Sequence, residues 1–346
     1  MDQLIELFNS GHYAELELQA RQLLLHDPQS GFFWKVLSVA LQMQGKDALD
    51  ALLTASKLLP DDAEAYCNLG NALRDRGQLV EAAEQYRSAL TLRPDSAETH
   101  GNLGNVLRDL GQHAEAATSL QRALQIKPGY AQAHYNLGIV MRELGQLESA
   151  IACYRQALAQ KPDFAEAYNN LGIALRESEQ LDEAISSFQQ ALQINPNYAD
   201  AHYNLANGLN DLGRFDAAVL QYRQALKLRP NHAEALNNLG NALKDTGLLD
   251  EACGAYEAAI AVEPDLIAPQ YSLSLLKTYS RSDPHLAMLE QQLPQVAGLP
   301  MEARIRFWFT LGKVREDMGL YDASFSAYQQ GNQLQQALLK WDEKVE

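Results

Sequence analysis

Prolines spaced 34 residues apart constrain the fold of this chain more than any other feature of its sequence. A fixed period of this size is the signature of repeat architectures, in which one unit cannot bury its apolar face alone and stacking completes the core. We number each repeat so that its proline is position 32, which gives six regular repeats: 63–96, 97–130, 131–164, 165–198, 199–232 and 233–266. The prolines are Pro60, Pro94, Pro128, Pro162, Pro196, Pro230 and Pro264.

Each repeat carries two sets of apolar or small residues with the spacing of one helix face. Positions 4, 7, 8 and 11 form one set, and positions 20, 24, 27 and 28 form the other. Glycine at position 15 is expected to end the first helix, as at Gly77 and Gly111, and the proline is expected to end the second. The pattern therefore predicts an all-α chain of antiparallel helix hairpins.

These residues resemble the tetratricopeptide repeat. The resemblance implies an α-solenoid whose hairpins form a right-handed superhelix, with the first helices on its inner, concave wall. We expect three segments: two degenerate N-terminal repeats over 1–62, six regular repeats over 63–266, and an irregular helical pair followed by a further hairpin over 267–346. Trp34, Leu37 and Pro60 support the second degenerate repeat, and Trp308, Gly312 and Gly319 support the last hairpin.

Composition excludes several classes of function. The formal net charge is −16, whereas nucleic acids and anionic membranes are bound by basic surfaces, so we expect neither partner. The three cysteines, Cys67, Cys153 and Cys253, are scattered and lack metal-ligand spacing. We therefore expect no disulfide framework, no metal and no cofactor, and with no signal peptide or membrane span evident we expect a cytoplasmic protein.

A helical wheel places positions 2, 5, 6, 9, 12 and 13 of each first helix on the predicted groove. An asparagine ladder follows positions 6 and 9, and a basic stripe at position 12 lies beside an acidic stripe at position 13. The candidate peptide-binding residues are Asn68, Asn71, Asn102, Asn105, Asn136, Asn170, Asn204, Asn207, Asn238 and Asn241 of the ladder, and Arg74, Arg108, Arg142, Arg176 and Lys244 of the stripe.

Two explanations of the ladder stay open at this point. An Asn amide both donates and accepts hydrogen bonds, which suits a peptide backbone. The ladder resembles the one in the repeats of O-linked N-acetylglucosamine transferases, and this resemblance implies a grip on extended polypeptides. The same asparagines could instead bond to the neighbouring repeat. The Arg and acidic stripes could likewise pair with each other, and Ile139 and Ile173 make an apolar spot within the ladder.

No catalytic motif is evident in the sequence, so we expect this chain not to be an enzyme. The leading hypothesis is a protein-interaction scaffold that binds an extended polypeptide through the ladder. Residues 303–334 resemble the junction between repeats and catalytic domain in bacterial tetratricopeptide–sulfotransferase proteins. This resemblance implies a bacterial chain and an alternative: the substrate-recognition arm of a larger transferase, sulfotransferase rather than glycosyltransferase. A second alternative is self-association with a neighbouring copy through Leu334, Leu338, Leu339 and Trp341.

Overall fold

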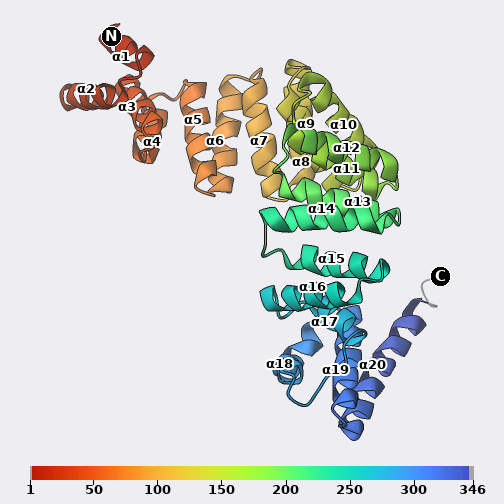
Figure 1. The fold of residues 1–346 in the computed structure, drawn as a ribbon. Coiled ribbons are helices and arrows are strands. Elements are labelled where there is room, and N and C mark those ends of the chain that lie inside the picture. Colours follow the sequence, from red (N-terminus) through yellow and green to blue (C-terminus); the bar gives the residue numbers. More distant parts are fainter. Residues whose placement is uncertain (1, 343–346) are drawn as a thin grey trace. The chain divides into compact units, whose positions relative to one another are not determined.

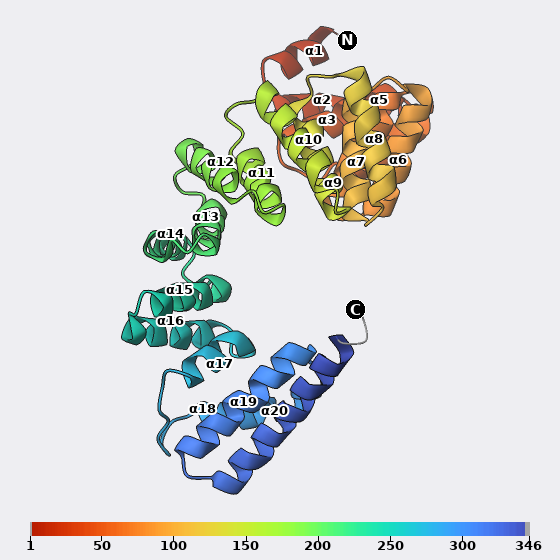
Figure 2. The same ribbon diagram turned by 90° about the vertical axis from the view of Figure 1, so that its right-hand side faces the viewer.

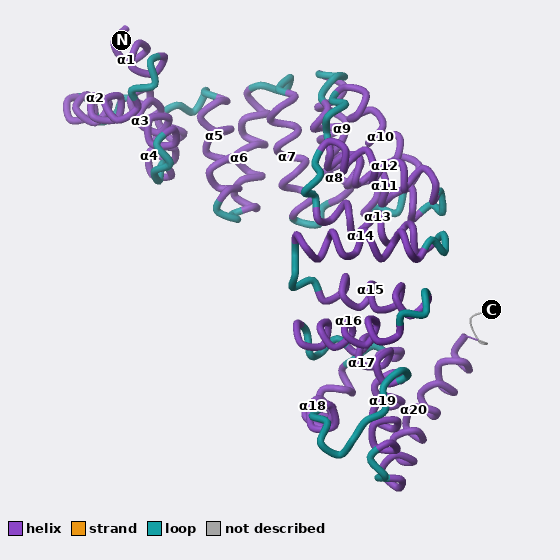
Figure 3. The backbone as a smooth tube through the Cα atoms, in the orientation of Figure 1, coloured by secondary structure: helices purple, strands orange, loops and turns teal. Residues whose placement is uncertain are grey.

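The computed structural model describes residues 2–342, and within that range it contains helices and turns but no strand (Figures 1 and 3). The chain divides into two compact units, Met1–Ala174 and Leu175–Glu346, whose boundary lies inside a helix. Over residues 2–342, no helix combines the length and apolar content that a membrane span requires. The elements are α1 (Asp2–Asn9), α2 (Tyr13–His26), α3 (Gly31–Met43), α4 (Leu49–Leu58), α5 (Ala63–Asp75), α6 (Leu79–Leu92), α7 (Ala97–Asp109), α8 (His113–Ile126), α9 (Ala131–Glu143), α10 (Leu147–Gln160), α11 (Ala165–Glu177), α12 (Leu181–Ile194), α13 (Ala199–Asp211), α14 (Phe215–Leu228), α15 (Ala233–Asp245), α16 (Leu249–Val262), α17 (Ile267–Ser274), α18 (His285–Gln292), the 3-10 helix η1 (Leu293–Gly298), α19 (Met301–Asp317) and α20 (Tyr321–Asp342).

The six regular repeats form the predicted hairpins. Each has a first helix of 13 residues and a second of 14, as in α5 and α6. In the first unit, α5, α6 and α7 lie side by side, and the first helices α5, α7 and α9 also contact one another in succession (Figure 1). In the second unit α13 contacts α15 in the same way. We call the surface made by successive first helices within a unit the first-helix wall.

The turn between the two helices of a repeat requires a residue with positive φ. Glycine supplies it in five regular repeats, with φ from 69° at Gly213 to 81° at Gly247. The repeat 165–198 has Glu179 there instead, at φ 62°. A side chain in this left-handed conformation costs about 1–2 kcal/mol, so this turn carries backbone strain that the other five avoid.

The core of a repeat forms where the first helix comes close to the ring at position 24. A methyl group on Gly138 would lie 2.6 Å from the Tyr154 ring, and one on Gly240 would lie 2.5 Å from the Tyr256 ring. Both tyrosines are fully buried. The small residue at position 8 is therefore required by the large residue at position 24, because protein interiors leave no room for overlapping atoms.

The side chain at position 4 holds the turn that joins consecutive repeats. His100 Nε2 lies 3.0 Å from the carbonyl oxygen of Pro94, and His202 Nε2 lies 3.0 Å from that of Pro196. The Trp34 indole donates to the Pro28 carbonyl in the same way. Because a carbonyl oxygen can only accept, the imidazole Nε2 is the donor. These side chains therefore connect the first helix of one repeat to the proline turn at the end of the preceding repeat.

The C-terminal part of the second unit departs from the 34-residue repeat. Helices α17, α18 and η1 pack with α19 around Tyr279, Leu289 and Phe307, all buried. Helices α19 and α20 then form a last hairpin and lie side by side (Figure 2). Leu334 and Leu338 of α20 are half-buried and Leu339 is exposed; the side chain of Trp341 lies outside the described residues.

The two ends of the chain present different surfaces. Position 21 of each repeat lies on its second helix. The residue there is buried in the repeats over 63–232, as at Ile151 and Val219, because the first helix of the next repeat covers it. Phe325 occupies that position in α20 and is 71% exposed. On α1, the polar residues Gln3 and Glu6 are exposed, and so are the apolar residues Ile5 and Phe8.

Candidate functional site

Hydrogen bonds join five of the ten ladder asparagines to a neighbouring repeat: Asn71, Asn102, Asn170, Asn207 and Asn238. In the first unit, Asn102 Nδ2 donates to Asn71 Oδ1 at 3.1 Å, and the Tyr86 hydroxyl donates to the same oxygen at 2.7 Å. In the second unit, Asn238 Nδ2 donates to Asn207 Oδ1 at 3.2 Å, and Tyr222 donates to it at 2.7 Å. Position 9 therefore accepts from position 24 of its own repeat and from position 6 of the following repeat.

Tyrosine at position 5 provides a second form of this connection. Asn170 Nδ2 donates to the Tyr135 hydroxyl at 3.0 Å, and Asn238 donates to the Tyr203 hydroxyl at 3.3 Å. The Tyr135 ring packs on Phe164 with centroids 4.7 Å apart. Phe164 occupies position 34, just before the next first helix, so the two rings fill the first-helix wall at this point.

The remaining ladder amides are also mostly engaged. Asn136 accepts from Gln132, and Asn241 accepts from the Tyr256 hydroxyl at 2.8 Å. Burial raises the pKa of Tyr256 to about 12, so its phenol stays protonated and acts as the donor. Asn204 has a partner as well. The bonds of Asn136 and Asn241 lie within their own repeats, whereas those of Asn71, Asn102, Asn170, Asn207 and Asn238 connect neighbouring repeats.

Asn68 and Asn105, both in the first unit, differ from the other ladder residues. Asn68 has no hydrogen-bond partner among the described residues, because position 9 of the preceding repeat is Val39. Asn105 Oδ1 is buried and unpartnered, because position 24 of its repeat is Leu120, which has no hydroxyl. These two ladder residues lie on α5 and α7.

The basic stripe at position 12 is largely paired with the acidic stripe at position 13. Arg74 bonds to Asp75 at 2.8 Å, Arg108 bonds to Asp109 at 2.7 Å, and Arg176 bonds to Asp211 of the next repeat at 2.6 Å. The longer pair Lys244–Asp245 spans 4.0 Å. Arg142 also has an interaction partner. Exposed pairs of this kind contribute about 0–1 kcal/mol each, so they mainly neutralise charge on the wall.

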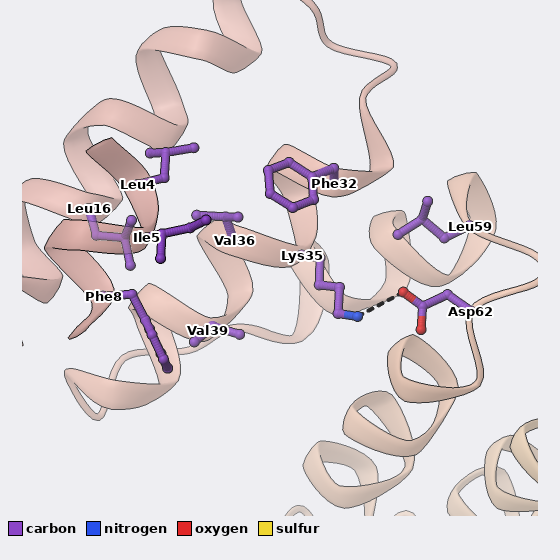
Figure 4. Close-up of a pocket in the computed structure, with 10 residues that line it drawn as sticks. All are labelled: Leu4, Ile5, Phe8, Leu16, Phe32, Lys35, Val36, Val39, Leu59 and Asp62. Atoms are coloured by element: carbon purple, nitrogen blue, oxygen red, sulfur yellow. Dashed lines mark hydrogen bonds and ion pairs between the residues drawn. The ribbon is translucent and has the colours of Figure 1, made fainter. Parts of the chain in front are cut away.

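An apolar hollow of about 330 Å³ opens on α3, in the degenerate repeat 31–62 (Figure 4). Phe32, Val36 and Val39 project into it from positions 2, 6 and 9 of this repeat, where the regular repeats carry mainly acidic residues and asparagine. Ile5 and Phe8 of α1 face them and are about half exposed (Figure 4). The complete lining is Leu4, Ile5, Phe8, Leu16, Phe32, Lys35, Val36, Val39, Leu59 and Asp62.

A single ion-paired group accompanies the apolar side chains of this hollow. Lys35 Nζ donates to Asp62 at 2.8 Å and to Glu64 at 2.7 Å. Partial burial opposes the charge on Lys35, but the bonds to the two carboxylates outweigh it and raise the Lys35 pKa. The ammonium is thereby held against the α4–α5 turn.

A polar hollow of about 210 Å³ occupies the equivalent place in the next repeat, 63–96. It stays open because positions 5 and 34 are small there, Cys67 and Ser96, whereas the repeat 131–164 fills the same place with Tyr135 and Phe164. Glu64 lines the polar hollow and also binds Lys35, so the two hollows adjoin. The lining is Ala63, Glu64, Cys67, Asn68, Asn71, Ala89, Arg93, Ser96, Glu98 and Thr99.

Asn68 and Asn71 lie on α5, in the first-helix wall, and their role in binding stays a prediction. The apolar hollow is not predicted from the sequence, in which residues 1–62 are interpreted only as degenerate repeats. A signal was present: once Trp34 fixes the register of this repeat, Phe32, Val36 and Val39 fall on groove positions. Apolar residues on groove positions, where the regular repeats are polar, indicate an exposed apolar surface.

Family models support the assignment of the repeats. Models described as tetratricopeptide repeat match residues 95–163, 135–199, 187–219 and 233–266, and a model described as TPR repeat matches 70–107 and 207–247. Together they cover residues 70–266 without a gap, more than half of the chain. The chain is a tetratricopeptide repeat protein. Repeats of this family are protein-interaction modules, so it is a protein-interaction scaffold.

Solved structures show the same fold. PilF of Pseudomonas aeruginosa is 21% identical with a TM-score of 0.55, over 62% of this chain and 97% of that one. The APC/C hetero-tetramer Cut9–Hcn1 is 23% identical with a TM-score of 0.55, over 69% of this chain and 48% of that one. YrrB, described as a TPR protein with an unusual peptide-binding site, is 24% identical with a TM-score of 0.49, over 55% of this chain and 98% of that one. At these identities the likeness concerns the fold alone.

Proposed function

We propose that the chain binds an extended polypeptide along the first-helix wall of its first unit, with the main contacts in the repeats 31–62, 63–96 and 97–130. The observation that carries this proposal is the open polar hollow around Asn68, whose amide the neighbouring repeats do not use. An amide with both donors and its acceptor available matches the N–H and C=O groups of an extended backbone.

The same reasoning gives the remaining ladder residues a structural role. Asn170 and Asn238 donate to tyrosine hydroxyls of the preceding repeat, so removing them would loosen the stack before it affected a ligand. The two sequence-based alternatives, a transferase arm and self-association, stay predictions, as do a cytoplasmic location, a bacterial origin and the absence of catalysis.

A selected peptide tests the proposal. A random dodecapeptide library displayed on phage is panned against the full chain, and enriched peptides are synthesised and titrated by fluorescence anisotropy. We expect Asn68→Ala to weaken binding about fivefold, the worth of one hydrogen bond, and to leave the unfolding midpoint unchanged.

Asn241→Ala is the matched control in the second unit. Its oxygen accepts from Tyr256, so this variant should lower the unfolding midpoint and leave the affinity unchanged. The proposal is wrong if no peptide is enriched, or if the Asn68 and Asn241 variants affect affinity equally.

A further inference from the structure

The adjoining hollows differ in chemistry although they occupy equivalent places in consecutive repeats. The apolar hollow has aromatic and aliphatic walls, with Phe8 44% and Phe32 40% exposed. Its one ammonium, on Lys35, is already bound by two carboxylates. A guest in this hollow therefore gains by burying apolar surface and needs no polar partner, which defines a bulky aliphatic or aromatic side chain.

The polar hollow and its rim carry an excess of negative charge. Glu64 and Glu98 line it, with Arg93 as the single cation. Adding the neighbouring Lys35–Asp62 pair leaves the combined site with three carboxylates against two cations. Burial raises the pKa of the Cys67 thiol, and the charges of Glu98 and Glu64 raise it further, in keeping with negative surroundings. A basic side chain complements this hollow.

The two hollows adjoin through Lys35, which lines the apolar hollow and binds Glu64 of the polar hollow. One extended peptide that follows the first helices can therefore place one side chain in each hollow. We propose that the chain selects peptides that carry a bulky apolar side chain and, at a fixed separation from it, a lysine or arginine. This inference rests on the proposed peptide-binding function and specifies its partner.

Two substitutions on α3 convert the apolar hollow to the chemistry of its neighbour, and helix content is measured first because Val36 also packs against the core residues Leu4, Leu16 and Ala40. The double variant Val36→Asn/Val39→Asn installs the residues that repeat 63–96 carries at the same positions, 6 and 9. Val80→Asn on α6 is the matched control, because Val80 is 58% exposed and lines neither hollow. If helix content falls in the double variant, Phe32→Asn replaces it.

The experiment uses dodecapeptides selected on the full chain and their synthetic variants. We expect an enriched motif with an apolar and a basic residue at one fixed separation. The double variant should weaken binding about tenfold or more, and Val80→Asn should not. Replacing the peptide's basic residue with glutamine should cost affinity on the native chain and much less on Glu98→Gln.

The outcomes separate this inference from the proposed function. Selected peptides that respond to Asn68→Ala but not to Val36→Asn/Val39→Asn would overturn the two-hollow motif and leave peptide binding standing. Motifs without a fixed separation between the two residues, or with an acidic residue in place of the basic one, would overturn it as well. Failure to enrich any peptide overturns both.

Discussion

The repeats 131–164 and 199–232 share most of their features and differ in one that matters. Both have tyrosine at positions 5 and 24 and histidine at position 4. Position 9 is Ile139 in the first and Asn207 in the second. The Tyr222 hydroxyl donates to Asn207, whereas the Tyr154 hydroxyl is buried without a partner. The residue at position 9 thus decides whether the tyrosine hydroxyl at position 24 has a hydrogen-bond acceptor.

This difference shows that positions 9 and 24 are coupled. When position 9 is Asn and position 24 is Tyr, the two side chains form a hydrogen bond, as Asn71 and Tyr86 do. When they are Ile173 and Phe188, neither side chain has a polar group. When only one of the two residues is polar, its polar atom is buried without a hydrogen-bond partner: Asn105 Oδ1 in the pair with Leu120, and Tyr154 Oη in the pair with Ile139. Burying such an atom without a partner costs about 1–3 kcal/mol.

The largest expected loss of stability comes from removing an asparagine whose side chain accepts two hydrogen bonds. Asn207→Ala removes the acceptor of both Tyr222 and Asn238, so we expect the free energy of unfolding to fall by about 2–3 kcal/mol. Asn105→Ala removes an unpartnered oxygen and gains helix propensity, so it should be neutral or stabilising by about 0.5 kcal/mol. Urea titrations followed by circular dichroism give both values. Equal losses in the two variants would contradict the coupling.

Removing the tyrosine hydroxyl should have opposite effects in the two repeats. Tyr222→Phe strands the Asn207 oxygen and should cost about 1–2 kcal/mol, whereas Tyr154→Phe removes an unpartnered hydroxyl and should stabilise by up to about 1 kcal/mol. In an Ile139→Asn background, Tyr154→Phe should become destabilising, because that hydroxyl would then have an acceptor. Thermal unfolding of the four variants checks the signs; a cost for Tyr154→Phe in the native background would count against this account.

The smallest expected effect concerns the turn that differs between repeats. Glu179→Gly removes the strain of a side chain at φ 62°, and the greater freedom of glycine in the unfolded chain offsets part of the gain. We expect a net stabilisation of about 0.5 kcal/mol, measured as a shift of the urea midpoint. Gly213→Ala, at φ 69° in the next repeat, is the reverse control and should destabilise. A loss of stability in Glu179→Gly would show that the glutamate side chain contributes more than its strain costs.

The sequence was sufficient to predict the hairpins but not the use of their polar residues. The period of 34 and the residues at positions 8, 15, 24 and 32 predicted both helices of every regular repeat, because each feature acts within one hairpin. The partner of Asn170 lies on the preceding repeat, and a wheel drawn for one helix cannot show it. The open hollow likewise depends on two residues 29 positions apart, Cys67 and Ser96, being small together.

The exposed Phe325 has a consequence for how such a chain can be lengthened. In the repeats over 63–232 the following first helix covers this position. A hairpin grafted after α20 could therefore bury the Phe325 side chain in the same way. For protein engineering, Phe325 thus marks the place on α20 against which the first helix of an appended hairpin could pack.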